Sequence, residues 1–239
     1  MRILHVDTAT EWRGGQNQIV VTAEGQRRLG HDARVFVNEQ GELARRADDA
    51  LIPVVRATVG RGDLSWRTVS ALRSAVRAFE PEVLHVHESH GLLGSLLSAG
   101  LATPRPRLIA SRRVDFPLRA ASRFKYARMD RILAVSRAVA EVLKQGGLPE
   151  AQIRLVHEGV RDRAPRSGGR DALRALGVPV QALVVGNVAQ LVDHKDHATL
   201  LRAAALVLKE QPECRFVICG DGERLTALLA LADELRIVH

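Results

Sequence analysis

Residues 65–90, SWRTVSALRSAVRAFEPEVLHVHESH, contain a helical pattern followed at once by a strand-like run. Apolar residues recur at intervals of three, four and three positions: Val69, Leu72, Val76 and Phe79. This spacing is typical of one buried helix face, and Ser65 is a suitable N-cap. The apolar run at 83–87 is short enough for a buried strand. A helix feeding directly into such a strand is the repeating element of a parallel α/β sheet.

The same alternation extends on both sides of this segment. Further strand-like runs lie at 3–6, 34–37, 108–111, 132–135 and 153–156. A second helical pattern, 136–145, stops at Gly146-Gly147, a usual C-terminal signal. The sequence therefore predicts a first Rossmann-like domain over residues 1–160.

A polar segment with Pro and Gly, residues 161–170, interrupts the pattern, and we interpret it as a linker. The alternation then restarts, with helices at 171–176, 197–210 and 223–235 and strands at 183–188 and 215–219. Residues 237–239 read as the opening of another strand. A domain over 171–239 has roughly 70 residues against the ~100–150 of a usual domain. We expect an α/β protein of two Rossmann-like parallel-sheet domains, the second incomplete.

The composition agrees with a packed globular protein of this class. Aromatic residues make up 3% of the chain, so aliphatic side chains must fill the core, as in parallel sheets covered by helices. A strand-like run directly at the N-terminus leaves no room for a signal peptide, and no apolar run reaches the ~20 residues of a membrane span. Cys214 and Cys219 are expected as small buried hydrophobes of a reducing compartment. A cytoplasmic protein is expected, with peripheral contact to the inner face of the membrane as an alternative.

The net charge of +8 is unevenly distributed. Residues 1–165 contain 26 Lys and Arg against 18 Asp and Glu, whereas residues 166–239 contain 9 of each kind. Residues 105–137 alone hold ten basic and two acidic residues. Such a field favours anionic partners, namely a phospholipid surface, a phosphorylated acceptor or nucleic acid. Nucleic acid is disfavoured, because stacking aromatics are few and no binding motif is present.

Two glycines, Gly14 and Gly15, follow the first strand directly and precede a helix that starts near Gln16. Ligands of open α/β sheets bind at the carboxyl ends of the strands. Glycines at that position let the backbone approach a diphosphate at a helix N-terminus, although an ordinary tight turn has the same pattern. The dinucleotide fingerprint G-x-G-x-x-G is absent, which disfavours a dehydrogenase.

A second motif, HVHESH, contains His85, His87 and His90 at the end of a strand. Three interpretations remain open: a polar active-site cluster, structural histidines with satisfied hydrogen bonds, and a zinc site, for which this spacing is weak evidence.

Two further loops of the second half follow strands. One contains Gln190 and Lys195, and a lysine there can reach a phosphate as a point charge, unless it is simply solvated. The other, CGDGE, contains Gly220 and Gly222 in what is otherwise a common turn sequence.

Taken in order, the segments WRGGQNQ, EVLHVHESHG, LIASRRVDFP, ILAVSRAVAEVL, GNVAQLVDHKDHATLLRAAALV and FVICGDGERLTALLALADEL resemble family-4 retaining glycosyltransferases of the GT-B fold. They span essentially the whole chain. The resemblance implies two Rossmann-like domains, the N-terminal one on the acceptor side and the C-terminal one binding a nucleotide-diphosphate sugar. It also implies that neither a metal ion nor another cofactor is needed.

The resemblance implies roles for individual residues. Gly14 and Gly15 would approach the diphosphate, and His87 would contact the transferred sugar. Lys195 would neutralise the leaving diphosphate, and Gly220 and Gly222 would lie close to the nucleotide.

Two positions depart from the family pattern. Gln190 stands where an arginine is common, so Arg112 or Arg113 would have to supply that charge. Glu158-Gly159 replaces the family's Asn-Gly. The family's paired-glutamate segment would fall beyond residue 239. On this interpretation the chain is C-terminally truncated and has little or no activity alone.

The expected activity is sugar transfer from a nucleotide-diphosphate sugar to a glycan or lipid-linked acceptor, such as an envelope polysaccharide or lipopolysaccharide. No carboxylate is an obvious nucleophile, which favours retention by a front-face route. Arg112 and Arg113 are also candidates to meet the acceptor or a membrane. So are Arg119, Arg123 and Lys125, on a helix expected within 116–131 that could meet anionic lipid, unless the helix is merely solvated. A nucleotide-sugar epimerase and a non-catalytic sugar-nucleotide-binding fragment are the alternatives.

Overall fold

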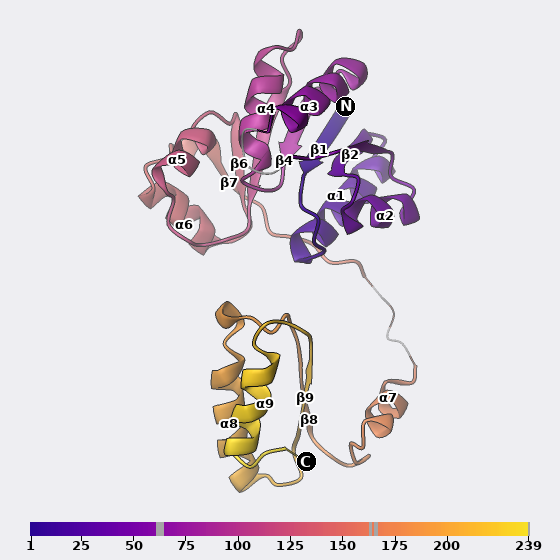
Figure 1. Cartoon of the computed structure of the whole chain (residues 1–239), viewed down its shortest axis with the longest axis vertical. Helices are drawn as coiled ribbons and strands as arrows, with labels where there is room; N and C mark the ends of the chain where they lie inside the picture. Colours follow the sequence, from indigo (N-terminus) through magenta and orange to yellow (C-terminus); the bar gives the residue numbers. More distant parts are fainter. Residues whose placement is uncertain (61–64, 163, 165–166, 239) are drawn as a thin grey trace. The chain divides into compact units, whose positions relative to one another are not determined.

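The chain forms two compact units, Met1–Asp162 and Arg163–His239 (Figure 1). A computed structural model describes residues 1–60, 65–162, 164 and 167–238. Each unit is built from parallel strands with intervening helices, so the α/β class expected from the sequence is confirmed.

The first unit has a seven-stranded parallel sheet in the order β3-β2-β1-β4-β5-β6-β7. Its strands are β1 Arg2–Asp7, β2 Asp32–Asn38, β3 Val54–Ala57, β4 Val83–Val86, β5 Arg107–Arg112, β6 Arg131–Ala134 and β7 Ile153–Leu155. The order runs outward from β1 in one direction and from β4 in the other. Because β1 and β4 are neighbours, residues about 80 positions apart in sequence lie side by side at the centre of the sheet.

Figure 1 shows the helices that connect these strands. Among the described residues of this unit there are six α-helices and a short 3-10 turn. They are α1 Gly14–Arg28, α2 Glu42–Asp49, α3 Trp66–Phe79, α4 Gly91–Gly100, α5 Ala120–Tyr126, α6 Arg137–Gln145 and η1 Glu150–Gln152. Ser65 caps α3 by accepting a hydrogen bond from the backbone N–H of Thr68, and Ser136 caps α6 through Val139. Gly147, with φ of +77°, follows the end of α6, which confirms the predicted stop.

Two apolar clusters cover the two faces of this sheet. Leu4 and Val6 point to the face on which α3, α4, α5 and α6 pack, and this is the larger cluster. Ile3 points to the other face, where α1 and α2 pack. The residues of β1 that share this second face with Ile3 are His5 and Asp7, both fully buried. One face of the sheet is therefore continuously apolar, and the other becomes polar towards the carboxyl end of β1.

Three elements of the first unit were not expected from the sequence: α2, β3 and α4. The helix expected within 116–131 is also shorter, since α5 ends at Tyr126. Its expected apolar face, formed by Ala120, Phe124 and Ala127, is exposed to solvent. Tyr126 and the nearby Met129 are buried instead.

The second unit contains one two-stranded parallel sheet among the described residues, β8 Val184–Val188 paired with β9 Arg215–Cys219. Its helical segments are α7 Gly169–Ala175, η2 Asp193–Lys195, α8 His197–Glu210 and α9 Leu225–Glu234. The predicted bounds of α8 and β9 are confirmed. Few of its apolar side chains are buried: Ala182, Leu191, Leu201, Ala204 and Cys214.

Some expectations for the second unit need correction. The segment interpreted as a linker, residues 161–170, contains the first two residues of α7, and residues 163 and 165–166 lie outside the described residues. Ile237 and Val238 belong to no strand, and residue 239 is not described. Cys214 is buried as expected, whereas Cys219 at the end of β9 is exposed. Within the described ranges, no helix combines the length and apolar character that a membrane crossing requires.

Candidate functional site

A cavity of about 700 Å³ lies at the carboxyl-end edge of the first sheet. The chain leaves β1 towards α1 and leaves β4 towards α4, and these two helices pack on opposite faces of the sheet. Loops that diverge in this way open a crevice, which is the usual ligand site of an open α/β sheet. The cavity is lined by Thr8, Ala9, Thr10, Glu11, Arg13, Asn38, Gln40, Val59, Gly60, Thr68, Val69, Glu88, His90 and Gly94. Hydroxyl, amide and carboxylate groups predominate, which suits a ligand rich in hydroxyl groups.

Two carboxylates hold the loop after β1 in place. Glu88 accepts hydrogen bonds from the backbone N–H of Thr8, at 2.8 Å, and from its hydroxyl. Asp7 accepts from the backbone N–H of Ala9, at 3.1 Å, and from the amide of Gln16. Burial, and secondarily the charge of Glu88, raise the pKa of Asp7 to about 6. These carboxylates are therefore committed to shaping the cavity wall.

Three buried histidines cluster on the polar face of the sheet. His5 of β1 and His85 of β4 occupy paired positions in the sheet, and His87 follows two residues later on the same side. Nδ1 of His5 lies 2.8 Å from Nε2 of His87, and Nε2 of His85 lies 2.8 Å from the hydroxyl of Ser111. Burial lowers the pKa of His5 to about 4. The pKa values of His85 and His87 also fall well below the ordinary histidine value, first because of burial. All three rings are neutral at pH 7.

The same three rings could in principle ligate a metal ion, because one ring nitrogen from each lies within 4.8 Å of the others. The zinc site considered from the sequence paired His85 and His87 with His90, but His90 lines the cavity and is not part of this group. An ion would have to break the His5–His87 hydrogen bond and would lie next to a guanidinium. The arrangement favours structural, mutually hydrogen-bonded histidines.

That guanidinium belongs to Arg113, just after β5. Its Nη2 lies 3.2 Å from Nδ1 of His87, and its Nη1 donates to the carbonyl oxygen of His87 at 3.3 Å. Nε forms an ion pair with Glu158, the residue that departs from the family pattern. The Arg113 side chain also reaches the start of α1, because a Cβ added at Gly15 would lie 3.7 Å from its Cδ. The structure therefore brings together Gly15, His87 and Arg113 of the predicted site residues.

Gly14 differs from Gly15 in its surroundings. A Cβ added at Gly14 would meet no atom within 4 Å, so nothing in the unit requires a glycine there. The open space above the N-terminus of α1 leaves room for a ligand to approach this backbone.

The other basic residues predicted to meet an acceptor or a membrane fall into two groups. Arg112 is buried, with its guanidinium donating to the carbonyl oxygen of Phe116 and lying over the ring of Tyr126. Lys125 is also buried, and its ammonium donates to the carbonyl oxygen of Ser89 at 3.1 Å. Both cations are used inside the unit. Arg119 and Arg123 are exposed.

In the second unit, the loops after β8 and β9 pack directly on each other. The backbone N–H of Leu191 donates to the carbonyl oxygen of Asp221 at 2.9 Å. A Cβ at Gly220 would lie 1.9 Å from the carbonyl oxygen of Ala189, and one at Gly222 would lie 2.4 Å from that of Leu191. Close approach of the neighbouring loop therefore accounts for both glycines. Gln190, in the same loop pair, and Lys195, in η2, are exposed to solvent.

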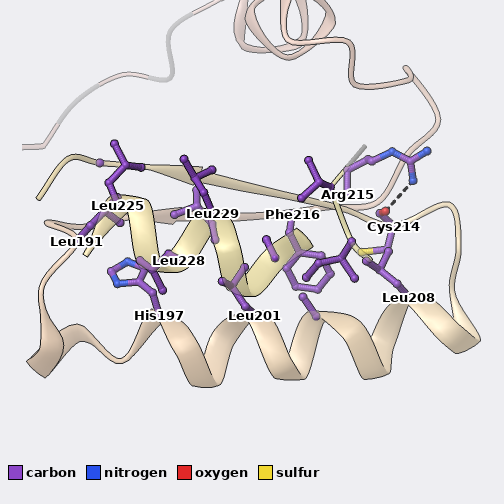
Figure 2. Close-up of a pocket in the computed structure, with 16 residues that line it drawn as sticks. Leu191, His197, Leu201, Leu208, Cys214, Arg215, Phe216, Leu225, Leu228 and Leu229 are labelled. Atoms are coloured by element: carbon purple, nitrogen blue, oxygen red, sulfur yellow. Dashed lines mark hydrogen bonds between the residues drawn. The ribbon is translucent and has the colours of Figure 1, made fainter. Parts of the chain in front are cut away.

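The second unit also contains an apolar pocket of about 300 Å³ (Figure 2). Leu201 and Leu208 of α8 face Leu228 and Leu229 of α9 across it, with Phe216 of β9 alongside. These side chains offer almost no hydrogen-bonding groups for a nucleotide or a sugar. The pocket is open to solvent, since Leu225 and Leu229, which line it, are both exposed.

Sequence reasoning missed most of the cavity in the first unit. Thr8, Asn38 and Glu88 line it because Asn38 ends β2, Thr8 directly follows β1, and Glu88 lies two residues after the end of β4. A search for polar residues at strand ends would have found these three. Thr68 and Gly94 belong to helices that reach the same edge, and no local signal marks them.

These features define a class: an α/β protein of two parallel-sheet units, with a polar crevice at the carboxyl ends of the strands in the first unit. The family model for glycosyltransferase family 4 matches residues 12–163, and the model for glycosyl transferases group 1 matches residues 170–239. The chain belongs to glycosyltransferase family 4.

Among curated proteins, D-inositol 3-phosphate glycosyltransferase of Streptomyces avermitilis is 32% identical over 128 residues, which cover 46% of this chain and 28% of that protein. This match therefore spans little more than a quarter of the relative's length.

Solved structures show the same fold at low identity. HepE of Anabaena, in complex with UDP and glucose, matches with a TM-score of 0.83 and 18% identity, covering 99% of this chain and 67% of HepE. The lipopolysaccharide outer core galactosyltransferase WaaB matches with a TM-score of 0.68 and 16% identity, covering 99% of this chain and 66% of WaaB. The UDP-GlcNAc 2-epimerase of Neisseria meningitidis matches with a TM-score of 0.65 and 14% identity, covering 100% of this chain and 71% of the epimerase.

Proposed function

We propose that this chain is the larger part of a glycosyltransferase that moves a sugar, with retention, from a nucleotide-diphosphate sugar to a glycan or lipid-linked acceptor. The acceptor that we favour is an envelope polysaccharide or lipopolysaccharide. The observation that carries the proposal is the polar crevice of a family-4 chain, with an open α1 N-terminus at Gly14 and the cation of Arg113 beside it. The UDP and glucose bound to HepE, and the galactosyltransferase activity of WaaB, support the same assignment.

The chemistry asks mainly for charge neutralisation. A nucleoside diphosphate leaves as a stable anion, so fixed cations and helix N-termini can assist its departure without a strong base. In this proposal Gly14, Gly15 and Arg113 provide such groups in the first unit, and Lys195 provides one in the second. Gln190 cannot contribute a charge, and Arg113 takes the place of the arginine common at that position.

We assign the acceptor to the cavity of the first unit and the donor nucleotide mainly to the second unit. The cavity wall includes two carboxylates, Glu11 and Glu88, against one arginine, Arg13, which pairs with Glu11. This balance suits an uncharged, hydroxyl-rich acceptor group better than a phosphate group. Glu88, already bonded to Thr8, would hold the wall in shape rather than act as a nucleophile.

A membrane contact is a separate part of the proposal. Exposed apolar side chains, Phe116 and Phe124, lie near the exposed cations Arg119 and Arg123 in this segment of sequence. Apolar groups combined with arginines are typical of a surface that meets anionic lipid. The double variant Arg119→Glu, Arg123→Glu should no longer sediment with phosphatidylglycerol vesicles. Unchanged sedimentation would refute this contact, and replacing Arg73, an exposed residue of α3, with Glu is the matched control.

The donor assignment is tested by calorimetric titration of the chain with UDP, GDP and ADP and their glucose conjugates. We expect one nucleotide to bind in preference to the others, with weak affinity. Lys195→Ala and Gly14→Val should each reduce that affinity, whereas Lys209→Ala, a change in α8 away from the loops, should not. Equal binding of all the nucleotides, unaffected by these variants, would contradict a specific donor site.

Turnover is a separate question from donor binding. We expect little or no sugar transfer by residues 1–239 alone, and measurable transfer would contradict that expectation.

A further inference from the structure

A continuous row of side-chain contacts crosses the polar face of the first sheet, from Gln26 through His5 and His87 to Arg113. Oε1 of Gln26, on α1, lies 2.7 Å from Nε2 of His5. Nδ1 of His5 lies 2.8 Å from Nε2 of His87, and Nδ1 of His87 lies 3.2 Å from Nη2 of Arg113. We infer that these four residues form a hydrogen-bonded chain with one fixed direction, and that Gln26, His5 and His87 are positioning residues for Arg113.

The direction follows first from the arginine end. A guanidinium can only donate, so Nδ1 of His87 must be the acceptor and carry no proton. In a neutral ring the proton then resides on Nε2, which donates to Nδ1 of His5. By the same reasoning His5 carries its proton on Nε2 and donates it to Gln26.

The glutamine end gives the same answer independently. Gln26 turns its carbonyl oxygen, an acceptor, towards His5, and so requires a donor at Nε2 of that ring. A second proton on His87 would go to Nδ1, where its N–H would face the N–H donors of Arg113. A second proton on His5 would go to Nδ1, where it would face the Nε2–H of His87. The chain therefore holds together only while both rings are neutral, in agreement with their burial.

This arrangement fixes what each group can do. Both ring nitrogens of His87 are engaged, so the ring as it stands supports Arg113 rather than offering a nitrogen to a ligand. Arg113 is additionally tied to Glu158 and lies against Gly15. The anionic ligand that Arg113 would meet there is the donor diphosphate, and this part of the inference rests on the proposed function. The hydrogen-bonded row from Gln26 to Arg113 is inferred only from contacts within the first unit.

Histidine ¹⁵N spectra of the intact chain test the direction. We expect Nδ1 of His87 and Nδ1 of His5 to be unprotonated and both Nε2 atoms to be protonated at pH 7. Gln26→Leu removes the terminal acceptor from a half-buried position and should return both rings to mixed tautomers. Gln26→Glu, which can only accept, should restore the wild-type pattern. Ser111→Ala is the matched control. It breaks the hydrogen bond between Ser111 and the adjacent His85 and leaves the contacts from Gln26 to Arg113 unchanged.

Opposite tautomers in the wild type would overturn the inference, as would unchanged tautomers in Gln26→Leu. Saturable Zn²⁺ binding that displaces the His5 and His87 signals would also overturn it, in favour of a metal site.

Titration with UDP separates this inference from the proposed function. Weakening by about tenfold in Gln26→Leu, recovered in Gln26→Glu, would support the role of the chain in placing Arg113. If the wild type binds no UDP, the proposed donor role fails, while the spectra still decide whether the chain exists.

Discussion

The two units follow the same alternation of strand and helix, yet they differ in how completely that alternation is packed. In the first unit, helices cover both faces of a seven-stranded sheet, and side chains such as Leu4, Phe36 and Leu84 are fully buried. In the described part of the second unit, two strands and their helices leave Leu206 and Leu229 exposed and an open apolar pocket between α8 and α9. A regular pattern therefore specifies local elements equally well in both units, but burial depends on how many elements share one sheet.

Hydrogen exchange should give the largest difference between the units. Backbone amides of β1, β4 and β5 should exchange more slowly than those of β8 and β9, because the first sheet is covered on both faces. We expect a gap of at least about 3 kcal/mol in opening free energy, or on the order of a hundredfold in rate. Mass spectrometry of the intact chain measures both units in one sample. Equal protection of the two sheets would contradict the expected difference in stability between the two units.

Acid should destabilise the first unit through its buried histidines. His5 has a folded pKa of about 4 against 6.5 when unfolded, so below pH 6.5 the unfolded chain takes up a proton that the folded unit does not. Between pH 6.5 and pH 4, His5 therefore lowers the free energy of unfolding by about 3 kcal/mol. His85 and His87 lower it further, since their pKa values are also depressed in the folded state.

Asp7 opposes this trend. Its pKa of about 6 in the folded state lies above the unfolded value of 3.8, so the folded unit gains stability as the pH falls between these values. With three histidines against one carboxyl, the net change should be a loss. Urea unfolding between pH 7 and pH 4 checks this, and a flat profile would contradict it. His5→Asn should make the profile less steep.

Gly220→Ala should destabilise the second unit without involving any ligand. The added methyl group would lie 1.9 Å from the carbonyl oxygen of Ala189, so the paired loops must separate. A cost of about 1–3 kcal/mol is expected from this overpacking. Exchange of the β8 and β9 amides should accelerate while β1 remains unchanged. Gly186→Ala, where a Cβ meets nothing within 4 Å, is the control.

Gly14→Ala should have the smallest effect on stability. Its methyl group would meet no neighbouring atom, and alanine favours a helix by up to about 1 kcal/mol. Thermal unfolding should therefore be unchanged or slightly shifted upward. If the backbone at Gly14 approaches a diphosphate, nucleotide affinity should nevertheless fall. Unchanged stability together with unchanged affinity would remove Gly14 from the proposed site.

Much of the fold could be predicted because its signals are local. The spacing of Val69, Leu72 and Val76 sets the buried face of α3, and Ser65 marks its start. By contrast, α4 has apolar residues around most of its circumference, and β3 is only four residues long, so neither has a clear period.

The site was harder to predict because it depends on which strands are neighbours. His87 was predicted as a site residue from its motif, but its partner His5 lies 82 residues earlier and meets it only because β4 pairs with β1. Lys125 was placed on the surface by its charge, whereas its long side chain reaches a buried carbonyl oxygen. The glycines of the second unit were assigned to ligand approach, and the contact between two loops, which requires them, has no sequence signature.

The narrow sheet of the second unit has a practical consequence for anyone who handles this protein. Within the described residues, β8 and β9 each pair with one strand, so each has one edge without a strand partner. Such edges can recruit strands from other molecules, and the exposed Val185 and Val188 of β8 would strengthen that attraction. Concentrated samples should therefore self-associate through β8 and β9, and purification at low concentration is advisable.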